Sequence, residues 1–80
     1  MVQESITAYI LIATTTRGPD ELLSFLQEKD IVKEAWIVYG DVDVVAKVIS
    51  PNFAKITDLI FALRKHPELK NTKTLICSTD

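Results

Sequence analysis

The chain has 80 residues, of which 48% are apolar and 25% are charged, and its 9 basic and 11 acidic side chains give a net charge of −2. This length suits one domain over residues 1–80, because shorter halves would not bury independent hydrophobic cores. The charge balance leaves no basic stripe to collect nucleic-acid phosphates, so we expect no direct binding of nucleic acid.

The first predicted elements are a strand over residues 6–16 and a short helix after it. The strand segment is rich in β-branched and aromatic residues. Pro19 suits the first position of a helix, and Asp20 and Glu21 place negative charge near its positive end. Apolar residues then recur at helical spacing, as Leu22, Leu23, Phe25 and Leu26. We expect this amphipathic helix to close at residues 29–30.

A hairpin is predicted next, from two strand-like runs over residues 32–39 and 42–49. Gly40 and Asp41 separate the runs, and glycine followed by aspartate favours a tight two-residue turn of the primed kind. The hairpin supplies the two middle strands of the chain.

A second helix and a last strand complete the pattern. Ser50 offers a helix cap and Pro51 the first helical position, while Pro67 should end the helix at His66. The apolar stripe of this helix is Phe53, Ile56, Leu59, Ile60 and Leu63. A strand over residues 72–79 follows. The order β-α-β-β-α-β predicts an α+β domain of the ferredoxin-like type, a four-stranded antiparallel sheet with two helices on one face.

The two-residue turn fixes the register of the hairpin and assigns its side chains to two faces. The face expected under the helices is wholly apolar and pairs Tyr39 with Val42, Ile37 with Val44, and Ala35 with Ala46. The other face pairs Val38 with Asp43, Trp36 with Val45, and Glu34 with Lys47. The helices would leave Trp36, Val38 and Val45 uncovered, and contiguous exposed apolar side chains usually mark contact sites. We predict that these three lie in an oligomer interface, although scattered surface apolar residues are also normal.

The residues and segments that the sequence lacks indicate how the chain is stabilised and in which compartment we expect it. One cysteine excludes an internal disulfide, and one cysteine with one histidine cannot supply a structural zinc site. We expect no metal or other cofactor, and a partner subunit as the support that a small domain needs. Residues 8–13 are too few to span a bilayer, and residues 1–4 lack the features of a signal peptide. Together with the sparse cysteine, this predicts a cytoplasmic protein.

No catalytic motif is visible, so we predict that the protein is not an enzyme. Cys77, within a predicted strand, is expected to be a small buried hydrophobe rather than a nucleophile. His66 is expected to contact the terminal carbonyls of a helix rather than act as a general base. Gly18 has neither a glycine-rich run nor a following lysine, so a plain turn is favoured over a phosphate loop.

The segment Gly40, Asp41, Val42 and Asp43 has two interpretations. One is a hairpin turn with two solvated aspartates. The other is a site for a zwitterionic ligand such as an amino acid, because glycine exposes backbone N–H groups while a nearby carboxylate accepts an ammonium group. The residues alone leave both interpretations open.

Two longer segments resemble a known family. Residues 36–48 place an aspartate, Asp43, three residues after Gly40 and before an aliphatic strand that ends in lysine and valine. Residues 67–76 form a turn, then threonine, any residue, threonine and an aliphatic strand. In order and spacing, residues 6–79 resemble the effector-binding domain of the Lrp/AsnC family of amino-acid-responsive regulators, also called the RAM domain. The chain has no residues for the helix-turn-helix domain of those regulators, so it resembles the stand-alone form.

The resemblance implies a homodimer whose sheets pack face to face, assembled further into rings of dimers. It also implies a small amino acid held between dimers, with residues 40–43 forming part of the pocket. Gly40 and Val42 would supply backbone contacts, and Asp43 would help hold the amino group of the ligand. Thr72 and Thr74 match the threonines of the family and would contribute hydroxyl groups.

The leading hypothesis is therefore a non-enzymatic sensor that binds a small amino acid at an oligomer interface and modulates assemblies of transcription regulators. Co-assembly with full-length Lrp/AsnC-type regulators is one route. The alternative is a small dimeric α/β-barrel enzyme, similar to a monooxygenase and acting on a small organic substrate, because fold alone does not decide function. A purely structural assembly module is a third hypothesis.

Overall fold

The computed structural model describes residues 5–15 and 19–77. Its elements are β1 (Ile6–Thr14), α1 (Pro19–Gln27), β2 (Val32–Ile37), β3 (Val44–Ser50), α2 (Phe53–Arg64) and β4 (Leu69–Ile76). The predicted order β-α-β-β-α-β is thus confirmed, and α1 begins at Pro19 as expected. Neither helix is long and apolar enough to cross a membrane, within the residues described.

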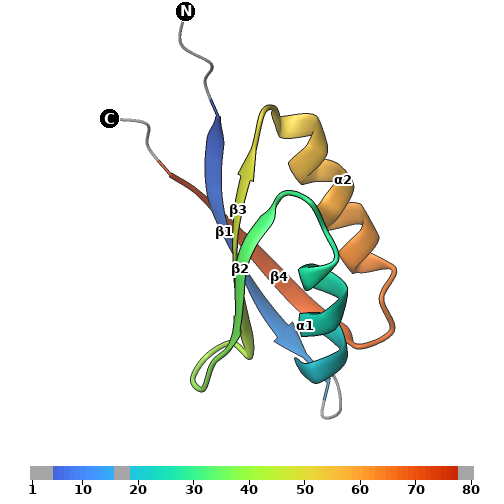
Figure 1. Cartoon of the computed structure of the whole chain (residues 1–80). Coiled ribbons are helices and arrows are strands. Elements are labelled where there is room, and N and C mark those ends of the chain that lie inside the picture. The colour runs from blue at the N-terminus through green and yellow to red at the C-terminus, as the bar shows by residue number, and fades with distance from the viewer. Residues whose placement is uncertain (1–4, 16–18, 78–80) are drawn as a thin grey trace, which may run out of the picture.

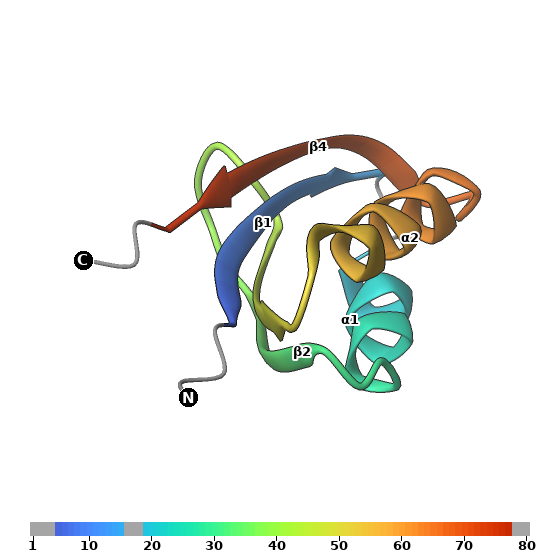
Figure 2. The same cartoon turned by 90° about the horizontal axis from the view of Figure 1, so that it is seen from above.

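The four strands form one antiparallel sheet in the order β2-β3-β1-β4. Both helices pack on the same side of this curved sheet and leave its other side open (Figures 1 and 2). The ferredoxin-like fold class is therefore confirmed. β1 and β3 are the two central strands. The residues at the ends of these two strands therefore lie in the middle of each end of the sheet.

The hydrophobic core lies between the helices and the two central strands. Alternate residues of β1 and β3 point into it, as expected for strands with one covered face. Its buried apolar members are Ala8, Ile10, Ile12, Leu22, Leu26, Val44, Ala46, Val48, Ile56, Leu59 and Leu63. Phe25 and Ile60, which the sequence placed on the apolar stripes of the helices, pack at the edge of this core and are only partly buried.

The start of α2 differs from the prediction. Ser50 is the last residue of β3 rather than a helix cap, and its hydroxyl group donates to the carbonyl oxygen of Asn52 at 2.6 Å. The cap is Asn52, whose side-chain oxygen accepts the backbone N–H of Lys55 at 3.0 Å, so the helix begins at Phe53 instead of Pro51. Asparagine in extended geometry is among the best residues for this role.

The hairpin keeps its predicted register but not its predicted turn. Ala35 pairs with Ala46 and Ile37 with Val44, as the sequence indicated. The strands stop there, however, and residues 38–43 form a wider connection, here called the hairpin loop. Glycine followed by aspartate fits a type II′ turn, in which the first residue has φ of about 60°, whereas Gly40 has φ of 152°. The tight turn was therefore a wrong prediction.

Several strand boundaries also differ. β1 ends at Thr14 rather than at residue 16, which lies outside the described residues. β4 begins at Leu69, before the predicted residue 72, because a bulge near Thr14 lets the strand pair with β1 earlier. Its predicted end at residue 79 also lies outside the described residues. A second bulge, at Lys33 in β2, lets Val32 reach the core.

Candidate functional site

The hairpin loop lies at the end of the sheet where β1 finishes and β4 begins (Figure 1). Gly40 and Asp41 are exposed at its tip, whereas Val42 and Asp43 are half-buried at its base. A Cβ built on Gly40 would meet nothing within 4 Å, so the backbone of the tip is open to a ligand. The structure thus places the predicted ligand residues of this loop where a small molecule or a neighbouring subunit has access.

Asp43 joins the hairpin loop to β1. Its Oδ2 accepts the backbone N–H of Thr14 at 2.8 Å and the Thr14 hydroxyl group at 3.2 Å. Its own backbone N–H donates to the carbonyl oxygen of Ile12 at 2.8 Å, and its carbonyl oxygen accepts the N–H of Val38 at 2.8 Å. The carboxylate therefore has a structural partner within the chain that the sequence did not indicate.

The predicted threonines of β4 lie on the other side of β1. Thr72 pairs with Ile12 and Thr74 with Ile10, and both threonines are half-buried on the helix side of the sheet. Asp43 and Thr72 thus flank the same residue of β1 from opposite edges. Two strand spacings separate them, roughly 10 Å. One chain brings the two segments to a common end of the sheet without closing them into one pocket, and Thr74 lies farther along β4.

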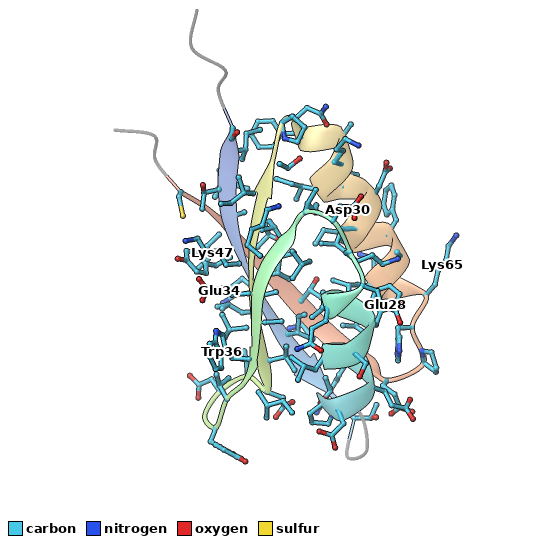
Figure 3. The ribbon with its side chains drawn as sticks, in the orientation of Figure 1. Glu28, Asp30, Glu34, Trp36, Lys47 and Lys65 are labelled. Atoms are coloured by element: carbon cyan, nitrogen blue, oxygen red, sulfur yellow. The ribbon has the colours of Figure 1, made fainter. Side chains whose placement is uncertain are left out.

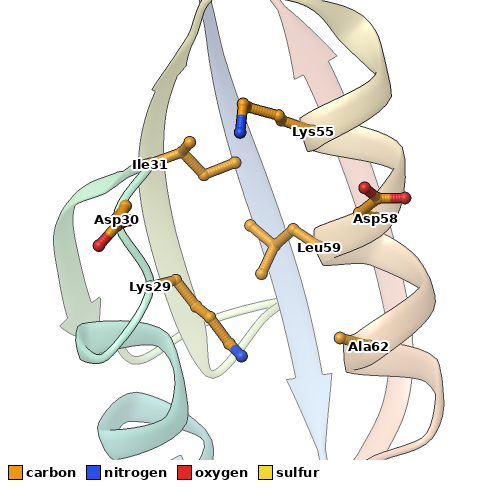
Figure 4. A pocket seen from close by; sticks show the side chains of 7 residues that line it. All are labelled: Lys29, Asp30, Ile31, Lys55, Asp58, Leu59 and Ala62. Atoms are coloured by element: carbon orange, nitrogen blue, oxygen red, sulfur yellow. The ribbon is translucent and has the colours of Figure 1, made fainter.

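Three hollows on the described surface lie away from these residues. The groove in Figure 4 lies between α2 and the segment that follows α1, with a volume of about 230 Å³, and its lining comprises Lys29, Asp30, Ile31, Lys55, Asp58, Leu59 and Ala62. Two further hollows adjoin β2 and the outer side of α1. None of these three hollows contains a predicted ligand residue.

The open face of the sheet carries the predicted interface residues. Trp36 is 62% exposed and points away from the helices, alongside Glu34 and Lys47 (Figure 3). Its indole N–H donates to Glu34 Oε1 at 3.2 Å. Val45, opposite Trp36 in the register, is half-buried, as is Val38. Trp36, Val38 and Val45 form an apolar patch. Tyr9 on β1 and Leu75 on β4 extend this patch.

The remaining candidates show no reactive arrangement. Cys77 is half-buried rather than fully buried, and its N–H continues the β4–β1 ladder by donating to Thr7. The His66 ring accepts the N–H of Glu68 through Nδ1 at 3.1 Å and packs edge-on against Phe25, so it binds a backbone N–H rather than the expected carbonyls. Within residues 5–15 and 19–77, no group of three His, Cys, Asp or Glu side chains is placed to hold a metal ion.

Similar solved structures share this architecture over almost the whole chain. FFRP-DM1 is 34% identical, the match covers 91% of this chain and 99% of that chain, and the TM-score is 0.85. The hypothetical protein PHS023 from Pyrococcus horikoshii is 33% identical, with coverage of 94% and 92% and a TM-score of 0.85. No curated protein matches the chain.

A longer structure matches in fold. The transcriptional regulator NMB0573 from Neisseria meningitidis, solved as a complex with L-Met, is 10% identical, with a TM-score of 0.82. The match covers 94% of this chain but 51% of the regulator, so this chain spans about half of its length. The family model of the Lrp/AsnC ligand-binding domain matches residues 7–79. That match covers nearly the whole chain, which therefore belongs to the Lrp/AsnC ligand-binding domain family.

Proposed function

We propose that this protein is a non-enzymatic sensor that binds a small amino acid and passes the presence of that ligand to a regulatory partner. The observation that carries the proposal is the match of residues 7–79 to a ligand-binding domain of regulators. The hairpin loop supports it, because an amino acid needs a carboxylate for its ammonium group and backbone N–H groups for its own carboxylate. Asp43 and the open backbone at Gly40 offer both within a few residues.

The proposed assembly is a homodimer formed through the open face of the sheet. A single chain of this size buries a small core and leaves Trp36, Leu75 and Tyr9 exposed on one face. A second copy would cover this apolar patch with an identical one, as two-fold symmetry requires. Charge repulsion does not oppose a dimer through this face, because Glu34 and Lys47 have opposite charges and lie opposite each other on its adjacent strands β2 and β3.

The proposed ligand pocket lies where dimers meet. The segments that carry Asp43 and Thr72 reach the same end of the sheet but stay apart within one chain. A neighbouring dimer would close the space above the hairpin loop. A ligand that binds only the assembled form must favour assembly, and this linkage turns the presence of the ligand into a change of subunit contacts.

The proposed partner is a regulator of the same family. Mixed assembly with full-length regulators would let a module of this kind act on transcription without contacting DNA, in a cytoplasmic setting. The fold match to a regulator solved with L-Met shows that this architecture occurs in a ligand-binding regulator.

Thermal melting against the twenty amino acids, with the solution mass recorded in parallel, tests the proposal. A ligand at 100 times its dissociation constant stabilises a folded protein by about 2.7 kcal/mol, which for a domain of this size is a rise in melting temperature of roughly 10–20 °C. We expect one small group of amino acids to give such a rise. A flat panel from a stable oligomer would contradict the sensor and favour an assembly module.

A further inference from the structure

The groove between α2 and the segment that follows α1 has an apolar floor (Figure 4). Ile31, Leu59 and Ala62 form this floor, and each is at least half-buried. The short side chain of Ala62 leaves space beside Leu59, which belongs to the hydrophobic core. The groove volume of about 230 Å³ is below the roughly 300–1,000 Å³ of pockets that hold drug-sized ligands, so the groove suits a molecule of a few carbon atoms.

Two lysines reach over this floor from opposite walls. Lys29 lies just after α1, and Lys55 lies in the first turn of α2. Figure 4 shows their ammonium groups apart from each other, with the side chains of Ile31 and Leu59 between them. The groove is therefore an apolar strip with a positive charge at each end.

An aromatic neighbour holds Lys29 in place. Its Nζ lies 4.5 Å from the centroid of the Phe25 ring, a cation–π contact. His66 packs edge-on against the same ring, and its Nδ1 accepts the N–H of Glu68. The carboxylate of Asp30 points away from the groove, and no ion pair joins Lys29 to a residue that the structure describes. The ammonium group of Lys29 is thus positioned with its N–H donors available to an anion.

The position of Lys55 is unfavourable for α2 itself. Lys55 is the third residue of the helix, whose first turn contains no acidic residue, and a cation near the positive end of a helix is disfavoured. Asp58 lies three positions later, where a helical ion pair could form, but its carboxylate points away from Lys55 and the described part of the chain has no ion pair there (Figure 4). Helix stability therefore does not explain Lys55, whereas an anion bound at this end of the groove does.

We propose that this groove binds a small straight-chain dicarboxylate. One carboxylate pairs with Lys29 and the other with Lys55, while the methylene chain covers Ile31 and Leu59. The spacing of the two ammonium groups selects the chain length, because each carboxylate must reach its own partner. A dicarboxylate without an amino group has nothing to offer the carboxylate of Asp43, so this site is separate from the one proposed at the hairpin loop.

Binding of the dicarboxylate series from malonate to adipate tests the proposal, at constant ionic strength and with butyrate as the monocarboxylate control. Backbone amide shifts in NMR spectra locate the site. We expect amides of residues 29–31 and 55–62 to shift, whereas those of residues 38–43 stay in place. One chain length should bind at least about threefold tighter than butyrate, which lacks the second carboxylate.

Variants of the groove test the two lysines and the floor. Lys29→Met and Lys55→Met keep the length of the side chain and remove its charge. Binding of the best dicarboxylate should weaken about tenfold at the half-buried Lys29 and about threefold at the exposed Lys55. Ala62→Leu fills the groove and should abolish binding. Lys65→Met removes an exposed charge just after α2 and outside the groove, so it is the matched control and should bind as wild type.

Equal weakening by Lys65→Met would indicate general attraction of anions and overturn the proposal. Undiminished binding in Ala62→Leu, or no shift of the groove amides with any member of the series, would also overturn it. If Ala62→Leu does not fold, the lysine variants decide, because Lys55→Met removes a charge that α2 disfavours and should fold at least as well as wild type. The melting experiment with amino acids tests the proposed function independently of these outcomes.

Discussion

Among the residues that the structure describes, Gly40 is the one with positive φ, and this backbone geometry restricts which residue can stand there. Its φ of 152° lies in a region that side chains other than glycine rarely adopt, although a Cβ there would meet no atom within 4 Å. Gly40→Ala should therefore lower the free energy of unfolding by about 1–3 kcal/mol through backbone strain alone. Chemical denaturation measures this change, with Asp41→Ala, an exposed neighbour in the same loop, as the control. Equal stability of the two variants would show that the loop relaxes to another conformation.

The role of a residue could be predicted from the sequence only where the residues that it acts with are close to it in the chain. Gly40 and Asp43 stand out because a turn residue and a carboxylate occur together. The bond of Asp43 to Thr14 spans 29 positions, and no local pattern reports such a contact. A threonine in the register of Ala8, Ile10 and Ile12 was the available signal. It indicated a buried hydroxyl group but not its acceptor.

The helices and strands could be predicted because the spacing of the apolar residues agrees with the positions of the residues that start and end each element. Pro19 marks the start of α1, and the paired apolar runs define the hairpin and its register. The errors lie where two local signals compete. Ser50 and Asn52 both suit a helix cap, and only the length of β3 decides between them. The bulge at Lys33 was not predictable, because it depends on how Val32 meets the core.

The cap of α2 gives a prediction for the element as a whole. α2 has no acidic residue in its first turn, so Asn52 is the side chain that satisfies its amino end. Asn52→Ala should cost about 1 kcal/mol of stability, whereas Asn52→Asp should retain the cap and add a favourable charge at the positive end of the helix. Thermal denaturation compares the variants, and Asn71→Ala, exposed in β4, serves as the control. Similar melting of Asn52→Ala and Asn71→Ala would argue against the cap.

The whole molecule has two unlike sides. The helix side is closed over a core, whereas the open side of the sheet exposes Trp36, Tyr9 and Leu75. Glu34 and Lys47 lie on this open side beside Trp36 (Figure 3). Contiguous apolar area of this kind on a small domain usually marks a contact surface. The alternation of the hairpin predicted which residues face this side, because a fixed register assigns every side chain to one of two faces. It did not reveal what covers them.

The assembly proposed for this face can be tested by one substitution and its matched control. Trp36→Glu would bury a carboxylate beside Glu34 in a face-to-face dimer, with no added positive charge to pair it, and would remove the largest apolar side chain of the patch. We expect the dissociation constant of the dimer to rise at least tenfold. Phe53→Glu makes the same change at a residue that is 57% exposed on α2, on the other side of the sheet, and should leave the dimer intact. Light scattering over a dilution series gives both masses. A dimer that survives Trp36→Glu, or one that Phe53→Glu weakens equally, would place the interface elsewhere and with it the pocket that the hairpin loop is proposed to share.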